Sequence, residues 1–291
     1  MLKTHLALTL VAAIYGATFT LAKEVMPEFM GPFGFIAVRV TCAFVLFLIY
    51  HRIFVKEPVA YYTDYLYFFV CAVFGVAMNT LLFFQGLSIT HPVNASLIMT
   101  MSPVFVLLFA TISKAEQTNG SKIGGIMLGA LGAGMIIGGP RIDADAGHWL
   151  GDLLVLMNAA SYAVYLVIVK PLMRRYQPMT IITWVFFFGS LLVLPFGFNE
   201  AVNARWAEMT PLVWFSVAFV TIGTTFFAYL LNAYALKRVN SSVVGAYIYL
   251  QPFMATIIAV GFGGYFLSWD QLIYSLLIFA GVYLVSRNPK Q

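Results

Sequence analysis

Arg39 is the one charged side chain that lies well inside an apolar run of this sequence. An arginine can bind a carboxylate through its charge and its planar fork of N–H donors, and charges within a membrane are functional candidates because they are costly there. Arg39 lies about six residues, ~9 Å at 1.5 Å per residue, from the outer end of its run, and its side chain can snorkel across much of that distance. Two interpretations stay open: Arg39 anchors its helix, or it contacts a solute or a gate. In the second case the site favours zwitterionic or anionic solutes.

Amide and aromatic side chains inside other apolar runs are further candidates for binding. An unpaired amide in hydrocarbon is costly, so each one must face another helix or water, and a tyrosine hydroxyl needs a partner there as well. A cavity lined by several of them would suit a planar or amphipathic solute, whereas each alone could equally bond across helices. The candidates of this kind are Tyr15, Asn79, Asn158, Tyr162, Trp184, Asn232 and Tyr247.

Two prolines inside apolar runs, Pro103 and Pro252, directly follow the polar residues Ser102 and Gln251. A proline within a helix removes a backbone donor and frees a carbonyl one turn earlier. Freed groups at membrane depth can face a cavity and bind a polar ligand. The alternative is a kink that only shapes the helix, so the four residues are cavity candidates beside that simpler interpretation.

The sequence lacks the residues that membrane catalysts and pumps need at depth. All 11 acidic residues and 4 histidines lie in loops or near the ends of apolar runs, so no metal-ligand pair, Ser/His pair or aspartate pair can be built inside a membrane. No Gly-Lys signature for binding ATP phosphates occurs either. We therefore expect no catalytic residue, metal or cofactor, and exchange or facilitated diffusion without obligatory proton coupling.

The elements that must position these residues are membrane helices. The chain of 291 residues is 62% apolar and 9% charged, against about 25% charged residues in a soluble domain. A spanning helix needs roughly 20 apolar residues, and ten such windows fit. They lie near 5–25, 33–54, 66–88, 93–113, 121–140, 149–171, 178–199, 211–235, 241–265 and 270–287.

The basic residues between the windows are unevenly distributed. If the N-terminus lies inside, 12 of the 16 lysines and arginines fall in inner segments and 3 in outer ones, with Arg39 within a window. Such a bias over short loops indicates orientation. Both termini are therefore predicted to be cytoplasmic. The net charge of +5 is read as an orientation signal, so nucleic acid is excluded as a partner.

A weak internal repeat divides the windows into two sets of five. The residues that match at an offset of 149 are Gly86-Leu87 with Ala235-Leu236, Ser102-Pro103 with Gln251-Pro252, and Gly132 with Gly281. An odd number of spans in each half turns the second half upside down relative to the first. The predicted fold is an all-α polytopic membrane protein. Its ten transmembrane helices form two inverted five-helix repeats, residues 1–140 and 148–291, around a central cavity.

Several short motifs follow one another in a fixed order. The first window contains Tyr15-Gly16-Ala17-Thr18-Phe19 and ends near Lys23, and the second window contains Arg39. The motif from Asn94 to Pro103 in the first half corresponds to Tyr249 to Pro252 in the second half. This order resembles the EamA-type family of the drug/metabolite transporter superfamily, with Tyr15 where that family usually has tryptophan. The resemblance implies a ten-helix bundle with inverted repeats, and export or exchange of small metabolites across the cytoplasmic (inner) membrane of a bacterium.

The function expected is therefore that of an integral membrane transporter. It would export or exchange small metabolites, amino-acid-like or amphipathic organic solutes, by alternating access. Two other classes stay open: a membrane partner subunit that transports nothing, and an intramembrane enzyme. The expected partners are a small-molecule solute and the lipid bilayer. The small-residue pairs Gly125/Gly129 and Gly134/Gly138 pack helices within the chain or in a dimer, so a monomer or weak homodimer is expected.

Overall fold

The computed structural model describes residues 2–112, 120–138, 148–236, 238, 247, 250–261 and 269–286, and every regular element in these residues is a helix. Most elements are α-helices, η1, η2 and η4 are π-helical, and η3 is a 3-10 helix. Their bounds are α1 (Leu2–Val25), α2 (Pro32–Tyr50), η1 (His51–Val55), α3 (Tyr62–Ala72), η2 (Val73–Ala77), α4 (Met78–Ile89), α5 (Pro92–Met99), α6 (Ser102–Ile112), α7 (Gly120–Gly138), α8 (His148–Ile168), α9 (Lys170–Met173), α10 (Pro178–Val202), η3 (Trp206–Glu208), α11 (Pro211–Ala218), η4 (Phe219–Phe227), α12 (Ala228–Leu236), α14 (Leu250–Gly261) and α15 (Trp269–Ser286).

Seven helical runs among the described residues are long and apolar enough to cross a membrane. They are Leu2–Val25, Pro32–Val55, Tyr62–Ile89, Pro92–Phe109, His148–Ile168, Pro178–Val202 and Pro211–Asn232. The predicted windows 121–140, 241–265 and 270–287 coincide with shorter apolar helices, Ile123–Ala133, Leu250–Gly261 and Leu272–Gly281. The sequence-based expectation of an all-helical, polytopic membrane protein is confirmed.

Proline marks where several of the helices begin. Pro32, Pro92, Pro178 and Pro211 each occupy the first residue of α2, α5, α10 and α11. A proline at this position costs the helix no hydrogen bond, because the first N–H groups of a helix have no partner within it. The proline ring also sets φ near its helical value. The described connections that lead into these four helices are therefore sharply bounded.

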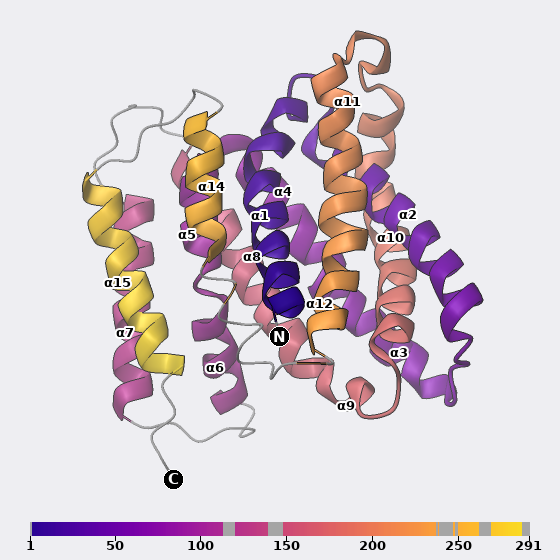
Figure 1. The fold of residues 1–291 in the computed structure, drawn as a ribbon, viewed down its shortest axis with the longest axis horizontal. Coiled ribbons are helices and arrows are strands. Elements are labelled where there is room, and N and C mark those ends of the chain that lie inside the picture. Colours follow the sequence, from indigo (N-terminus) through magenta and orange to yellow (C-terminus); the bar gives the residue numbers. More distant parts are fainter. Residues whose placement is uncertain are drawn as a thin grey trace.

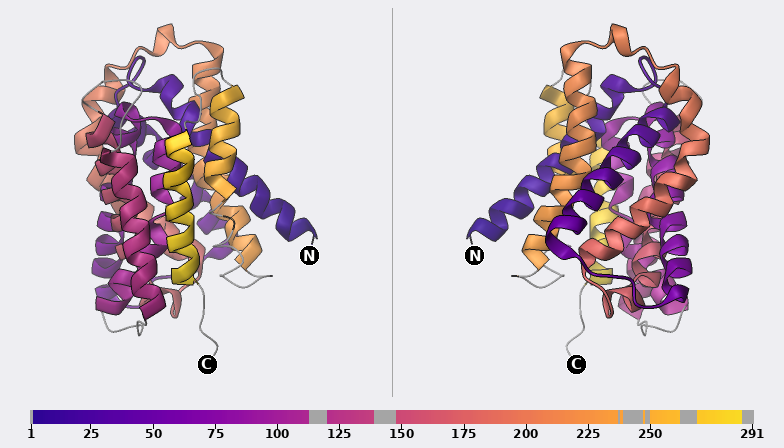
Figure 2. Two further views of the ribbon diagram at one scale, coloured as in Figure 1. Left: turned by 90° about the vertical axis from the view of Figure 1, so that its left-hand side faces the viewer. Right: turned by 90° about the vertical axis from the view of Figure 1, so that its right-hand side faces the viewer.

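The helices pack in pairs that are far apart in the sequence. The most extensive contacts join α2 with α10, α7 with α15, α4 with α8, and α1 with α14. In Figure 1, α7 and α15 stand side by side at one edge of the bundle, and α2 and α10 stand at the opposite edge. Figure 2 shows the N-terminal part of α1 projecting from the bundle, where Leu2, Leu6 and Leu10 are exposed.

The two helices at one edge approach each other at glycine. A Cβ on Gly132 of α7 would lie 2.9 Å from the carbonyl oxygen of Tyr274 in α15, and a Cβ on Gly281 of α15 would lie 2.6 Å from the backbone nitrogen of Gly129 in α7. Neither position has room for a side chain. The pair Gly125/Gly129 thus packs against Gly281 within the chain. The sequence left this role open.

The two helices at the opposite edge are tied together at both ends. A carboxylate oxygen of Glu57, which follows η1, accepts hydrogen bonds from the backbone N–H of Gln177 (2.9 Å) and the hydroxyl of Thr180 (2.5 Å) at the start of α10. At the other end, Glu200 of α10 accepts a 2.8 Å hydrogen bond from the backbone N–H of Gly34 at the start of α2. In each case a negative charge lies at the positive end of a helix dipole.

Candidate functional site

Arg39 of α2 lies deep in the bundle, in contact with side chains from two other spans. Its Nε donates a 2.7 Å hydrogen bond to Oγ1 of Thr225 in η4. Its guanidinium carbon lies 5.0 Å from the centre of the Phe84 ring in α4. No carboxylate among the described residues forms an ion pair with it. The guanidinium is thus held by a hydroxyl and an aromatic face, without a counter-ion in this part of the chain.

Four tyrosines form a cluster with this arginine. Electrostatic interactions link Arg39 with Tyr15 of α1 and Tyr229 of α12, and link Tyr229 with Tyr162 and Tyr165 of α8. All four are enclosed by protein and yet keep part of their accessible surface. None of their hydroxyls forms a hydrogen bond with another described residue. Phenol donors without a partner in the described part of the chain therefore lie in one cluster with a cation.

A π-helical segment supplies the hydroxyl that holds the arginine. Within η4, Oγ1 of Thr225 donates to the carbonyl of Val220, five residues earlier, at 3.3 Å. The neighbouring Thr224 hydroxyl lies 2.6 Å from the hydroxyl of Thr18 in α1. The segment thus joins α1 and α2 through adjacent threonines. π-Helical turns inside α-helices occur frequently at functional sites.

Two of the predicted amides lie together in a cross-helix contact. The side-chain amide of Asn158 in α8 donates a 2.6 Å hydrogen bond to the backbone carbonyl of Asn79 in α4. One turn away, the hydroxyl of Ser161 donates to the carbonyl of Phe74 in η2 at 2.8 Å. Asn158 is buried, and the interaction joins α8 to the span formed by α3, η2 and α4. Asn232 is half-buried on α12.

The first predicted proline coincides with a break in the helix. Helix α5 ends at Met99 and α6 begins at Ser102, just before Pro103. The side-chain hydroxyl of Thr100 donates to the carbonyl of Leu97 at 2.6 Å, and that of Ser102 donates to the carbonyl of Met99 at 2.8 Å. Side-chain hydroxyls thus bond to carbonyls on the N-terminal side of the break, and the Leu97 carbonyl also accepts from the backbone N–H of Thr100 (3.1 Å).

The second predicted proline lies in the first turn of α14. Pro252 is buried, Gln251 is half-buried, and the Pro252 carbonyl accepts a 2.8 Å hydrogen bond from Thr256. The residues just before Leu250, including Tyr249, lie outside the described part of the chain.

Two other predicted residues lie away from Arg39. Trp184 of α10 packs edge-on against Tyr65 of α3, with ring centres 4.9 Å apart, in an aromatic cluster between these helices. The hydroxyl of Tyr247 lies 2.9 Å from Nδ1 of His5, near the start of α1. Of the predicted set, the structure therefore brings Tyr15, Arg39 and Tyr162 together.

Other residues of this cluster carried little signal in the sequence. Tyr165 and Tyr229 stood out only as tyrosines within apolar windows, like several others. Thr225 and Phe84 resemble many other threonines and phenylalanines in the spans. Their place depends on which face each helix turns inward.

Two carboxylates near span ends are buried. Asp152 in the first turns of α8 is sealed from solvent and accepts a hydrogen bond from the hydroxyl of Thr90, whose carbonyl accepts one from Nζ of Lys23 at the end of α1. This network joins α1, the α4–α5 turn and α8 at one end of the bundle.

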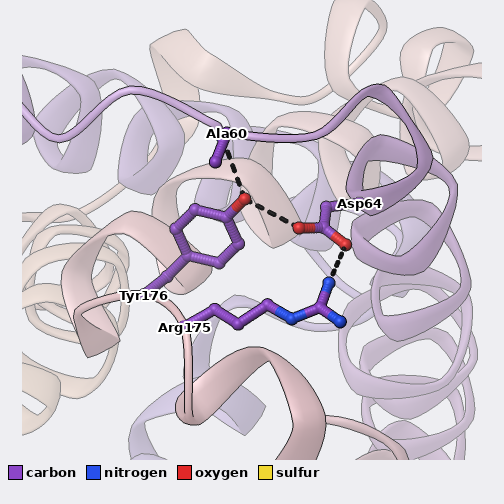
Figure 3. Close-up of polar contacts among 4 residues, drawn as sticks. All are labelled: Ala60, Asp64, Arg175 and Tyr176. Carbon is purple, nitrogen blue, oxygen red and sulfur yellow. Dashed lines mark hydrogen bonds and ion pairs between the residues drawn. The ribbon is translucent and has the colours of Figure 1, made fainter.

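The second buried carboxylate, Asp64 at the start of α3, lies at the other end (Figure 3). It accepts hydrogen bonds from the guanidinium of Arg175 (2.8 Å) and the hydroxyl of Tyr176 (2.7 Å), while that hydroxyl accepts one from the backbone N–H of Ala60 (2.9 Å). Burial, reinforced by the hydrogen bond to Asp64, raises the pKa of Tyr176. The network fastens the α8–α10 connection to the start of α3.

The chemistry available at the Arg39 cluster is binding. Its side chains offer a cation, phenol and threonine hydroxyls, and aromatic faces. Among the described residues, no three His, Cys, Asp or Glu side chains gather to hold a metal ion. The molecule is thus a multi-pass membrane protein with a polar cluster in its interior.

The chain belongs to the EamA-like transporter family, within the drug/metabolite transporter superfamily, because the family profile matches residues 2–138 and again residues 149–287. It is similar to an "Uncharacterized transporter" of Archaeoglobus fulgidus, with 27% identity over 99% of each chain. It is also similar to a "Probable terminal-alkyne amino-acid exporter" of Streptantibioticus cattleyicolor, with 27% identity over 67% of this chain and 64% of that protein. A solved structure titled only as a crystal structure of a protein has the same fold, with a TM-score of 0.63, 17% identity, and coverage of 97% of this chain and 96% of the other.

Proposed function

We propose that this transporter moves small organic solutes, amino-acid-like or amphipathic, across the membrane by alternating access, and that the Arg39 cluster binds them. The observation that carries the proposal is the cluster of Arg39 with four tyrosines, in which, among the described residues, the hydroxyls have no hydrogen-bond partner and the guanidinium has no counter-ion. Groups of this kind, enclosed yet partly accessible, suit the wall of a solute cavity. The name of the relative from Streptantibioticus cattleyicolor agrees with an amino-acid-like solute.

The proposed architecture is ten spans in two inverted halves, residues 1–140 and 148–291. The family profile matches twice, in step with these halves. The contact at Gly132, with Tyr274 and Ile278, mirrors the contact at Gly281, with Gly125 and Gly129, because each pair of numbers differs by 149. The same offset carries η2 (Val73–Ala77) onto residues 222–226, within η4. These correspondences support a two-fold relation between the halves.

Alternating access requires contacts that close each end of the bundle in turn. The Asp64–Arg175–Tyr176 network lies at the end that we propose is cytoplasmic, together with both termini, and the Lys23–Thr90–Asp152 network lies at the other end. We place the protein in the cytoplasmic membrane of a bacterium. A membrane partner subunit without transport would have no need of tyrosine hydroxyls that lack a hydrogen-bond partner among the described residues, and an intramembrane enzyme would need a reactive pair that the cluster does not offer.

Solute exchange in proteoliposomes tests this function. Vesicles loaded with one unlabelled amino acid or amphipathic acid, at the same pH on both sides, are expected to exchange it for the labelled compound. The double variant Tyr162→Phe/Tyr229→Phe should exchange at least about tenfold more slowly, since lost hydrogen bonds weaken solute binding. Tyr283→Phe, at a tyrosine that is 64% exposed, is the matched control. No exchange of any solute across a broad panel, by correctly folded protein, would refute the transport proposal.

A further inference from the structure

We infer, on the basis of the proposed function, that the solute carries a single carboxylate that binds the guanidinium of Arg39, attached to an apolar, planar body. Arg39 is half-buried, and among the described residues its contacts are a neutral hydroxyl and an aromatic ring. Because a charge that is partly removed from water is stabilised by pairing, the site is completed by an anion.

The free donors of the guanidinium fix the geometry of that anion. Thr225 occupies Nε, which leaves the two terminal nitrogens for a ligand. Terminal guanidinium N–H groups form paired hydrogen bonds with the two oxygens of a carboxylate or with a phosphate. The Phe84 ring stacks near the guanidinium and holds its plane without competing for these donors.

The charge of the site decides between these two anions. One guanidinium contributes a single positive charge, and the tyrosines Tyr15, Tyr162, Tyr165 and Tyr229 around it are neutral donors. A carboxylate brings one negative charge and leaves the filled site neutral. A phosphate monoester carries about −1.5 to −2 at pH 7 and would leave negative charge unpaired in a low-dielectric interior.

The other side of the site indicates the body of the solute. Two turns after Arg39 on α2, Phe47 packs against Phe186 of α10 (5.1 Å between ring centres) and Tyr229 (5.9 Å). Tyr229 thus contacts this aromatic cluster and also interacts with Arg39. At the sequence offset of 147 that pairs Tyr15 with Tyr162, Arg39 of the first half corresponds to Phe186 of the second half. Phe47 and Phe186 are buried in the core, so the partly accessible rings of this cluster are those of the tyrosines, including Tyr229. Aromatic faces beside a cation suit a solute whose carboxylate is attached to an apolar, planar body.

The test measures ligand-induced shifts in melting temperature of the full chain in lipid nanodiscs, with four probes of similar shape. They are phenylalanine, 3-phenylpropionate, phenylalaninamide and phenyl phosphate. Phenylalanine and 3-phenylpropionate, which carry a carboxylate, should bind at least about tenfold more tightly than the amide and the phosphate. Equal binding of phenylalanine and its amide, tighter binding of the phosphate, or no binding of either carboxylate would overturn the inference.

Variants locate the effect at Arg39. Arg39→Gln should lose roughly tenfold or more in affinity for 3-phenylpropionate, and Arg39→Lys should lose part of it, because lysine keeps the charge but not the fork. Arg205→Gln, at a side chain that is 60% exposed, removes the same charge elsewhere and should bind as the parent does. If both Arg39 variants bind 3-phenylpropionate with the affinity of the parent, the inference is wrong. If Arg39→Gln fails to fold, the affinity of Arg39→Lys for 3-phenylpropionate alone tests the inference.

The same probes separate this inference from the transport function. Carboxylate-selective binding without exchange in proteoliposomes would support the carboxylate site and refute transport. Exchange of phenylalaninamide at the rate of phenylalanine would support transport and refute the carboxylate site.

Discussion

At the scale of single residues, Asp64 illustrates how the helices at one end of the bundle are held together. Its ion pair with Arg175 involves a side chain that is 53% exposed, and such pairs are worth about 0–1 kcal/mol. Its hydrogen bond with Tyr176 is buried and continues to the backbone N–H of Ala60. The buried hydroxyl therefore contributes more than the charged partner does, since leaving buried partners unpaired costs about 1–3 kcal/mol.

Tyr176→Phe should lower the stability of the folded protein by about 1–3 kcal/mol, because it leaves Asp64 and the Ala60 N–H without their partner.

The raised pKa of Tyr176 also fixes the sign of a pH effect on stability. The folded chain keeps this proton to higher pH than the unfolded chain, so the contribution is present below the unfolded pKa of about 10 and declines as pH rises above it. Melting temperatures from pH 8 to 11 should show the decline in the parent and a weaker one in Tyr176→Phe. Tyr62→Phe, at a side chain that is 92% exposed, is the control. Identical pH profiles would contradict the assignment.

At the scale of elements, the structure depends on how closely the backbones of α7 and α15 approach. Membrane helices gain no hydrophobic free energy from contact with each other, so close packing at small residues holds them together. A Cβ at Gly132 would lie within 2.9 Å of a carbonyl oxygen, which cannot move aside without moving the helix. Gly124, in the same helix, has nothing within 4 Å of its Cβ position.

Gly132→Ala should therefore destabilise the protein by about 1–3 kcal/mol through overpacking. Gly124→Ala should leave stability unchanged or raise it slightly, because alanine is the better helix former. Thermal unfolding in detergent micelles measures both. Equal melting temperatures for the two variants would show that α7 and α15 do not meet at this glycine.

These elements also show what the sequence could and could not predict. Apolar length and prolines located the spans, and the offset repeat picked out Gly132 and Gly281. The tyrosines at 15 and 162 and the intramembrane Arg39 were identifiable because polar groups are rare at such depth. Thr225 was not, since a π turn contains more residues than an α turn and shifts the inward face of every residue after it. Asp152 was noted only as lying near an end, because burial there depends on Thr90 from another span.

At the scale of the whole molecule, the proposed inversion of the halves has a direct test. Under inversion, the loop at residue 58, after the second span, and the loop at residue 203, after the seventh, lie on opposite faces. In a background without Cys42 and Cys71, a membrane-impermeant maleimide added to intact cells should label Asn203→Cys but not Pro58→Cys. Permeabilised cells, in which both should react, are the control. Labelling of both loops in intact cells would favour parallel halves.

The two carboxylate ties between α2 and α10 restrict how this molecule can rearrange. Glu57 holds the start of α10 and Glu200 holds the start of α2. Sliding one helix along the other by one residue, on the order of 1.5 Å, would pull both carboxylates off their donors or press both into the helix ends. Shear between these helices is thereby blocked. Any change of shape must carry α2 and α10 together as one rigid body, and Arg39 travels with them.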